Sequence, residues 1–184
     1  MKGKPPSKGD DEEYLSPRQK MAQAILFTQE ALECADDPER YDEAEELLAK
    51  ALHLVPDDET IVSNYVGFCT QVAANHALDQ AHDDAIRYFR LALQHAPDDP
   101  ETWLDLGSAY AEQNMAMEAL EAWGQCLRVL NRKQDIYKEC VETIGENVTL
   151  IARAVDVHVP AKSEKRELQA GIARLIAALR SEKV

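Results

Sequence analysis

The chain has 184 residues, 45% of them hydrophobic, with only 7 glycines and 8 prolines, a composition that suits one all-helical domain with a sizeable core. Its 34 acidic and 20 basic residues give a net charge of −14, which disfavours binding to nucleic acid phosphates and to anionic membrane surfaces. No apolar run approaches the length of a membrane span, and the N-terminal stretch lacks the apolar centre of a signal peptide. We therefore expect a cytoplasmic protein with no membrane insertion.

The N-terminal segment differs in composition from the rest of the chain. Residues 1–15 are rich in Lys, Gly, Pro and Asp and have almost nothing to bury, which predicts a disordered tail. Ser16 and Pro17 then provide a helix N-cap and a first-turn proline. Ordered structure is therefore expected to begin at residue 16.

The most specific pattern of the chain lies between residues 103 and 123. Trp103, Leu106, Gly107 and Tyr110, followed by Ala119 and Trp123, reproduce the spacing W-x2-L-G-x2-Y…A-x3-F, with tryptophan at the last position. The second half of this pattern occurs twice more, at Ala85, Phe89, Ala92 and Pro97, and at Ala44, Leu48, Ala51 and Pro56.

These residues resemble the tetratricopeptide repeat family over about residues 17–131. The first repeat is degenerate, with Thr28, Ala31, Leu32 and Ala35 at the positions of its first helix. The resemblance implies an all-α fold of antiparallel helical hairpins stacked as a right-handed superhelix, an α-solenoid, whose concave groove holds another protein. Residues 16–131 would form three repeats, and residues 132–184 would form C-terminal capping helices.

The middle repeat is longer than its neighbours. The alanines that begin the second half of the pattern are Ala44, Ala85 and Ala119, and the first interval between them is longer than the second by seven positions. Seven positions correspond to two helical turns, so an apolar stripe stays nearly on one face. This predicts a first helix of about 59–78, roughly 30 Å long, that projects beyond its neighbours as a lip.

Two further helices are predicted after the repeats. A heptad-like stripe predicts a helix over about 134–157, interrupted only by Gly145 and ended by Pro160: Tyr137, Val141, Ile144, Val148, Ile151 and Val155. Ser163 would cap a last helix reaching about residue 181, with its own apolar stripe: Leu168, Ile172, Leu175, Ile176 and Leu179. This last helix either caps the core or occupies a partner surface, in its own chain or in a neighbour's.

Charge is unevenly distributed along the chain. Residues 29–126 contain 22 acidic and 4 basic side chains, whereas residues 161–184 contain 6 basic and 3 acidic ones. The body of the protein should therefore attract a basic or amphipathic segment. Four aspartate pairs, at 36–37, 57–58, 83–84 and 98–99, precede predicted helices, and we interpret them as helix caps rather than as metal or acid–base sites.

No pattern of catalytic or ligand-binding residues is present. Cys34, Cys69, Cys126 and Cys140 are scattered along apolar stripes and are interpreted as buried thiols. His76 and His82 are neither an i,i+4 pair nor part of an HExxH motif, the spacings typical of zinc sites on helices. There is no glycine-rich phosphate loop. We predict no enzyme activity, no cofactor and no metal, and we interpret Trp103 and Trp123 as core residues.

The concave groove implied by the resemblance would be lined from two first helices. In the middle repeat the positions are Asn64, Thr70, Gln71 and Ala74, and in the third repeat they are Glu101, Leu104, Asp105, Ser108 and Glu112. Family members that capture the carboxylate tails of heat-shock chaperones use Lys, Arg and Asn there, and no Lys or Arg stands at these positions. The groove is suited instead to a protein segment with Lys or Arg beside apolar anchors.

The sequence therefore predicts a non-enzymatic adaptor, scaffold or assembly factor that binds another protein. Two alternatives stay open. One is a dedicated client chaperone that resembles the translocator class of type III secretion chaperones, which are acidic and carry three such repeats. The other is a self-assembling structural protein, a homo-oligomer joined through its C-terminal helices.

Overall fold

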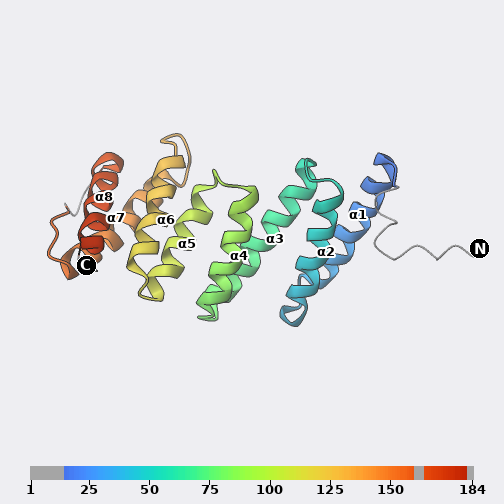
Figure 1. The fold of residues 1–184 in the computed structure, drawn as a ribbon, viewed down its shortest axis with the longest axis horizontal. Coiled ribbons are helices and arrows are strands. Elements are labelled where there is room, and N and C mark those ends of the chain that lie inside the picture. Colours follow the sequence, from blue (N-terminus) through green and yellow to red (C-terminus); the bar gives the residue numbers. More distant parts are fainter. Residues whose placement is uncertain (1–14, 160–163, 182–184) are drawn as a thin grey trace, which may run out of the picture. The chain divides into compact units, whose positions relative to one another are not determined.

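A computed structural model of the chain describes residues 15–159 and 164–181. This part contains no strand and is all-α (Figure 1). Its helices are α1 (Pro17–Cys34), α2 (Tyr41–Leu54), α3 (Glu59–Leu78), α4 (His82–His95), α5 (Pro100–Glu112), α6 (Ala116–Val129), α7 (Tyr137–Ala154) and α8 (Lys165–Ser181), with a 3-10 turn at Pro38–Arg40. The chain forms two compact units, one ending at Cys69 and the other beginning at Thr70, so that α3 contributes to both. The predicted tail lies outside the described residues, except for Leu15.

The first unit is built around the packing of α1 on α2. Ser16 caps α1 as expected, since its hydroxyl accepts a hydrogen bond from the backbone of Gln19 while the Gln19 side chain reaches back to Ser16. Small side chains of α1 are fully buried against its neighbour: Ala24, Ala31 and Cys34. The first half of α3 adds Phe68, whose ring meets Tyr41 edge-on with centroids 6.3 Å apart.

Helix lengths and positions repeat along the chain. Helices α2, α4 and α6 each have 14 residues, and they begin at Tyr41, His82 and Ala116, so the first of the two intervals is again longer by seven positions. Helix α3 has 20 residues and α5 has 13, a difference of the same size. The seven extra positions between the starts of α2 and α4 therefore lie inside α3. The predicted helix over 59–78 is confirmed by the bounds of α3.

The ends of α3 and α5 are also alike. Gln80 and Asn114, each the second residue after its helix, both adopt the left-handed conformation, with φ of 61° and 59°. In each case the next backbone N–H reaches back to a carbonyl in the last turn, from Ala81 to His76 at 2.8 Å and from Met115 to Tyr110 at 2.9 Å. This is the bonding of a Schellman helix end, and it turns the chain sharply into α4 and α6.

The second unit is centred on the contact between α5 and α6. Trp123 is fully buried, and its indole N–H donates to the carbonyl oxygen of Leu104 at 3.3 Å. A Cβ atom at Gly107 would overlap the Trp123 ring. Position 107 must therefore be glycine for the two helices to lie this close.

Helix α7 is shorter at both ends than the predicted 134–157. At its start, the chain is held in turns around Asn131, whose side chain accepts from the backbone of Lys133 and whose backbone N–H donates to Gln134. At its end, Asp156 is left-handed with φ of 53°, and Val157 bonds back to Ala152 at 2.9 Å. Gly145 does not interrupt the helix, because it is buried on the packed face and lies near Leu168.

Helix α8 packs on both α6 and α7. Its predicted stripe is confirmed: Leu168, Ile172 and Leu175 are buried, and Ile176 and Leu179 pack against the same core. The Lys165 ammonium donates to the carbonyl of Leu130 at 2.5 Å, and the Gln169 amide donates to that of Leu127 at 3.2 Å. These groups satisfy carbonyls that the end of α6 leaves unpaired. The predicted cap Ser163 and the predicted breaker Pro160 lie outside the described residues.

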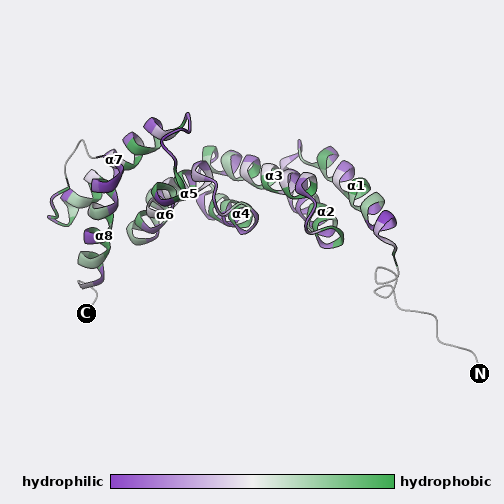
Figure 2. Ribbon diagram, turned by 90° about the horizontal axis from the view of Figure 1, so that it is seen from above, coloured by the Kyte–Doolittle hydropathy of each residue, from purple (hydrophilic) through white to green (hydrophobic). Residues whose placement is uncertain are grey.

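Apolar and polar residues are interspersed along each helix, as the hydropathy colours of Figure 2 show. Among the described residues, no helix combines the length and apolarity needed to cross a membrane. The four cysteines are free and buried, as the sequence predicts.

We expect Gly107→Ala to destabilise the second unit by about 1–3 kcal/mol, because the added methyl group overlaps the Trp123 ring. The matched control is Gly67→Ala in α3, where an added Cβ atom would meet nothing within 4 Å and where alanine should be neutral or slightly stabilising. Chemical denaturation of both variants gives the comparison. Equal free energies of unfolding for the two variants would show that α5 and α6 can move apart without losing stability.

We expect Leu168→Ala to lower the free energy of unfolding by about 2–5 kcal/mol, because this side chain of α8 is fully buried in the core of the second unit. Leu78→Ala is the control, since Leu78 is 82% exposed. If α8 leaves the core readily to occupy a partner surface, the two variants should unfold at similar denaturant concentrations.

Candidate functional site

The exposed side of α5 carries acidic residues at its start and at its end. Asp99 caps the helix by accepting from the backbone of Thr102 at 3.1 Å, and Pro100 occupies the first turn. Glu101, Asp105 and Glu112 are exposed. Ser108 is half-buried, and its hydroxyl donates to the carbonyl of Leu104 at 3.1 Å. Four of the five positions predicted on α5 therefore present at least part of their side chains to solvent.

Leu104 is the exception and corrects the prediction. It is only 9% exposed and belongs to the core formed with α6, α7 and α8. Helix α7 contacts both α5 and α6, and Leu104 belongs to the same buried core as residues of α7. The repeat pattern ends before α7, so the motif spacing contains no sign of this contact.

Helix α7 brings a further carboxylate towards α5. Partial desolvation of its carboxyl group, followed by the charges of Glu101, Asp99 and Glu139, raises the pKa of Asp105 to about 6. We call Glu101, Asp105 and Glu139 the acidic face. Within the part of the chain that the structure describes, none of the three forms an ion pair with a lysine or arginine.

The positions predicted on α3 carry no charge. Gln71 is exposed and donates through its amide to Asn75 at 3.2 Å, and Thr70 and Ala74 are half-buried. Asn64, also half-buried, lies in the first unit, whereas the other three lie in the second. By their distance from the helix ends, Gln71 corresponds to Asp105, so the acidic character is specific to α5.

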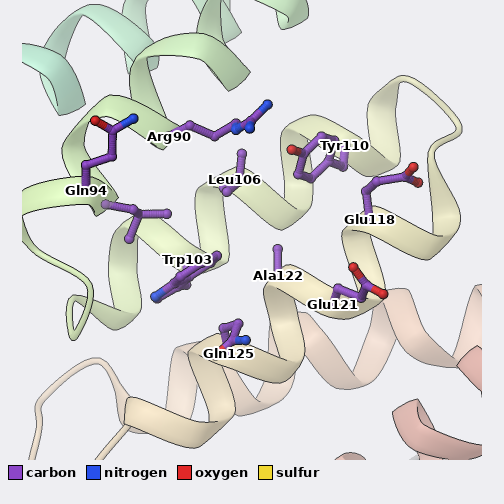
Figure 3. A pocket seen from close by; sticks show the side chains of 10 residues that line it. Arg90, Gln94, Trp103, Leu106, Tyr110, Glu118, Glu121, Ala122 and Gln125 are labelled. Carbon is purple, nitrogen blue, oxygen red and sulfur yellow. The ribbon is translucent and has the colours of Figure 1, made fainter.

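A pocket of about 500 Å³ lies on a different side of α5 (Figure 3). Trp103, Leu106 and Tyr110 line it from α5; with about 100° between successive residues, they lie nearly opposite Glu101, Asp105 and Glu112. Its other lining residues come from α4 and α6: Arg90, Leu93, Gln94, Glu118, Glu121, Ala122 and Gln125.

Trp103 agrees only in part with the prediction that it is a core residue, since it packs against the core of the second unit but also faces the pocket. It is half-buried, and its indole N–H donates to the carbonyl of Pro97 at 2.8 Å. Glu121 is paired with Arg180 of α8 at 3.1 Å, whereas Arg90 and Glu118 have no ion-pair partner among the described residues. The three-residue stripe on α5 was visible in the sequence, but its place beside a pocket lined also by α4 and α6 was not.

The remaining candidate groups have structural contacts. Asp37, Asp58 and Asp99 cap helices or turns through backbone N–H groups, as predicted. Asp83 instead accepts from the Gln113 amide at 2.7 Å. The imidazole of His76 stacks on the ring of Tyr88, with centroids 5.7 Å apart.

The thiols of Cys126 and Cys140 are not poised for nucleophilic chemistry. Both are buried in the core of the second unit. Burial raises the pKa of each thiol above its usual value, which disfavours the reactive thiolate.

In comparisons with known proteins, no protein-family model matches the chain, and no curated protein matches it.

We expect Asp105→Asn to stabilise the protein at pH 7, with a gain that shrinks as the pH falls towards 4. The folded chain holds the Asp105 proton up to about pH 6, above the usual range of an unfolded aspartate, so protonation favours folding and this contribution is lost as the pH rises from about 4 to 6. Because Asp105 is exposed, solvent screening should limit the gain to at most about 1 kcal/mol.

Urea denaturation at several pH values measures this difference. Raising the salt concentration to about 0.5 M should reduce the part of this difference that comes from like-charge repulsion, because salt screens that repulsion. A gain that is constant from pH 4 to 7 would show that ionisation of Asp105 is not its cause.

Proposed function

We propose that this protein is a tetratricopeptide-type interaction module that binds a segment of another protein on the acidic face of α5 and α7. The repeated helix lengths and the equivalent ends of α3 and α5 support a repeat architecture. Stacked repeats of this type offer helix surfaces to other proteins rather than reactive groups. The proposal concerns binding, and it assigns no chemical reaction to the chain.

The observation that carries this proposal is the uncompensated charge of the acidic face. Glu101, Asp105 and Glu139 come from two helices that are in contact, and repulsion from Glu101 and Glu139 adds to the partial desolvation that raises the pKa of Asp105. Such an arrangement costs free energy in the isolated chain. A lysine or arginine from a partner would relieve the repulsion and gain a charge-assisted hydrogen bond.

The same charges select the class of partner. An acidic peptide or a terminal carboxylate would add a further negative charge beside Asp105, which disfavours it. A cationic segment is favoured, and apolar side chains beside its Lys or Arg residues would supply the affinity that exposed ion pairs alone do not. We therefore propose an adaptor or assembly role for a basic, amphipathic segment of a client protein.

Simultaneous Glu101→Lys and Asp105→Lys should weaken binding of such a segment about tenfold at low salt, because attraction is replaced by repulsion at two positions. The matched control is Asp79→Lys with Asp98→Lys, which changes the net charge equally at exposed positions between helices. Folding of both variants can be checked by circular dichroism.

A peptide display library provides the ligands, and fluorescence anisotropy at low and high salt provides the affinities. We expect the selected peptides to combine Lys or Arg with large apolar residues. Selection of acidic peptides, or equal loss of binding in both variants, would contradict the proposed site. A loss on Arg90→Glu but not on Glu101→Lys with Asp105→Lys would assign binding to the pocket instead.

A further inference from the structure

Helix α1 leaves an apolar stripe exposed. Ile25 is 45% exposed, Leu26 is 60% exposed and Leu32 is 52% exposed, although α2 covers the opposite side of the helix. Ala22, one turn before Ile25, and Gln29, one turn after it, lie on the same side of the helix and are also exposed. These three are among only five large apolar residues that are exposed in the described part of the chain. Their concentration on one helix indicates a contact surface.

The stripe is symmetric in part about the midpoint between Ile25 and Leu26, and Leu32 would lie opposite Gln19. Ala22 and Gln29 lie equally far from this point, and so do Arg18 and Glu33, each about 11 Å along the helix axis. A second copy of α1 laid antiparallel across the stripe would therefore place Ile25 opposite Leu26 and Arg18 opposite Glu33. The central apolar pair and the charged ends are therefore complementary to themselves, as a two-fold interface requires.

The charges of α1 are opposite to those that its own dipole favours. No acidic residue stands in its first turn and no basic residue in its last turn. Arg18 lies instead near the positive end, and Glu33 near the negative end, and neither has an ion-pair partner among the described residues. An antiparallel copy would bring Glu33 of one helix beside Arg18 of the other. Each of these unfavourably placed charges would then be offset by an opposite charge.

We propose that the exposed stripe of α1 is a homodimer interface, occupied by α1 of a second copy in antiparallel orientation. Residues 1–14 of the same chain are a poorer occupant, because Met1, Pro5, Pro6 and Tyr14 are their only apolar side chains. The apolar stripe of α8, the other candidate for self-association, is already buried in its own chain. One 18-residue helix offers less area than a standard interface, so the dimer forms in a concentration-dependent manner.

Sedimentation velocity of the full chain over a range of concentrations tests the proposal. We expect the mass to rise from monomer to dimer, and we expect Ile25→Glu with Leu26→Glu to give a monomer at every concentration, with unchanged helix content. Leu78→Glu, at an exposed leucine of α3, should leave the dimer intact, and so should deletion of residues 1–14. A parent chain that stays monomeric, or a dimer that survives the double substitution, would overturn the proposal.

A charge exchange tests the antiparallel orientation. Arg18→Glu should weaken the dimer about tenfold, because Glu33 of the partner then faces a like charge at both ends of the interface. The same substitution should not destabilise the monomer, because an acidic first turn suits the helix dipole. Adding Glu33→Arg should restore the parental dissociation constant. Failure of this second substitution to restore the dimer would exclude the proposed pairing.

Discussion

The second unit depends on the close crossing of α5 and α6 at Gly107 and Trp123. Because no side chain stands at position 107, the Trp123 ring lies against the backbone of α5, and its N–H bonds to Leu104. The rotation of α5 about its own axis is thereby fixed. Glu101 and Asp105 are turned towards solvent on one side of the helix, and Trp103 and Tyr110 are turned towards the pocket on another. Both candidate surfaces on α5 follow from one steric requirement.

The end of this unit is closed by polar contacts as well as by apolar packing. Lys165 and Gln169 pair with carbonyls at the end of α6, and Arg180 pairs with Glu121 near the middle of the same helix. The basic character of the C-terminal helix is thus explained in part by contacts inside the chain. Arg180 of α8 is thus attracted to an acidic residue of the neighbouring helix α6. Within the described residues, no lysine or arginine pairs with the acidic face of α5 and α7.

The spacing of motif residues was sufficient to predict the positions of α2, α4 and α6 and the length of α3, because these depend on local periodicity and on small residues at helix crossings. Side-chain exposure was harder to predict. Leu104 belongs to a core shared with α7, which the repeat pattern does not include, and Trp103 is only half-buried beside a pocket that α4 and α6 also line. The ends of α7 are set by turns at Asn131 and Asp156, whose hydrogen bonds have no periodic signature. The stripe on α1 emerges only from the packing, which shows the side of the helix that α2 leaves uncovered.

The left-handed residues that follow α3 and α5 are positions where the stability of the protein could be increased by substitution. At both positions the structure needs a backbone conformation that glycine adopts freely and that costs a residue with a side chain roughly 1 kcal/mol or more. Asparagine, at position 114, tolerates it better than glutamine, at position 80. The two hairpin turns are therefore strained to different extents. A substitution to glycine should stabilise the turn between α3 and α4 more than the turn between α5 and α6. Since neither side chain has a hydrogen bond to any other described residue, these turns could be rebuilt without altering the acidic face, the pocket or the stripe on α1.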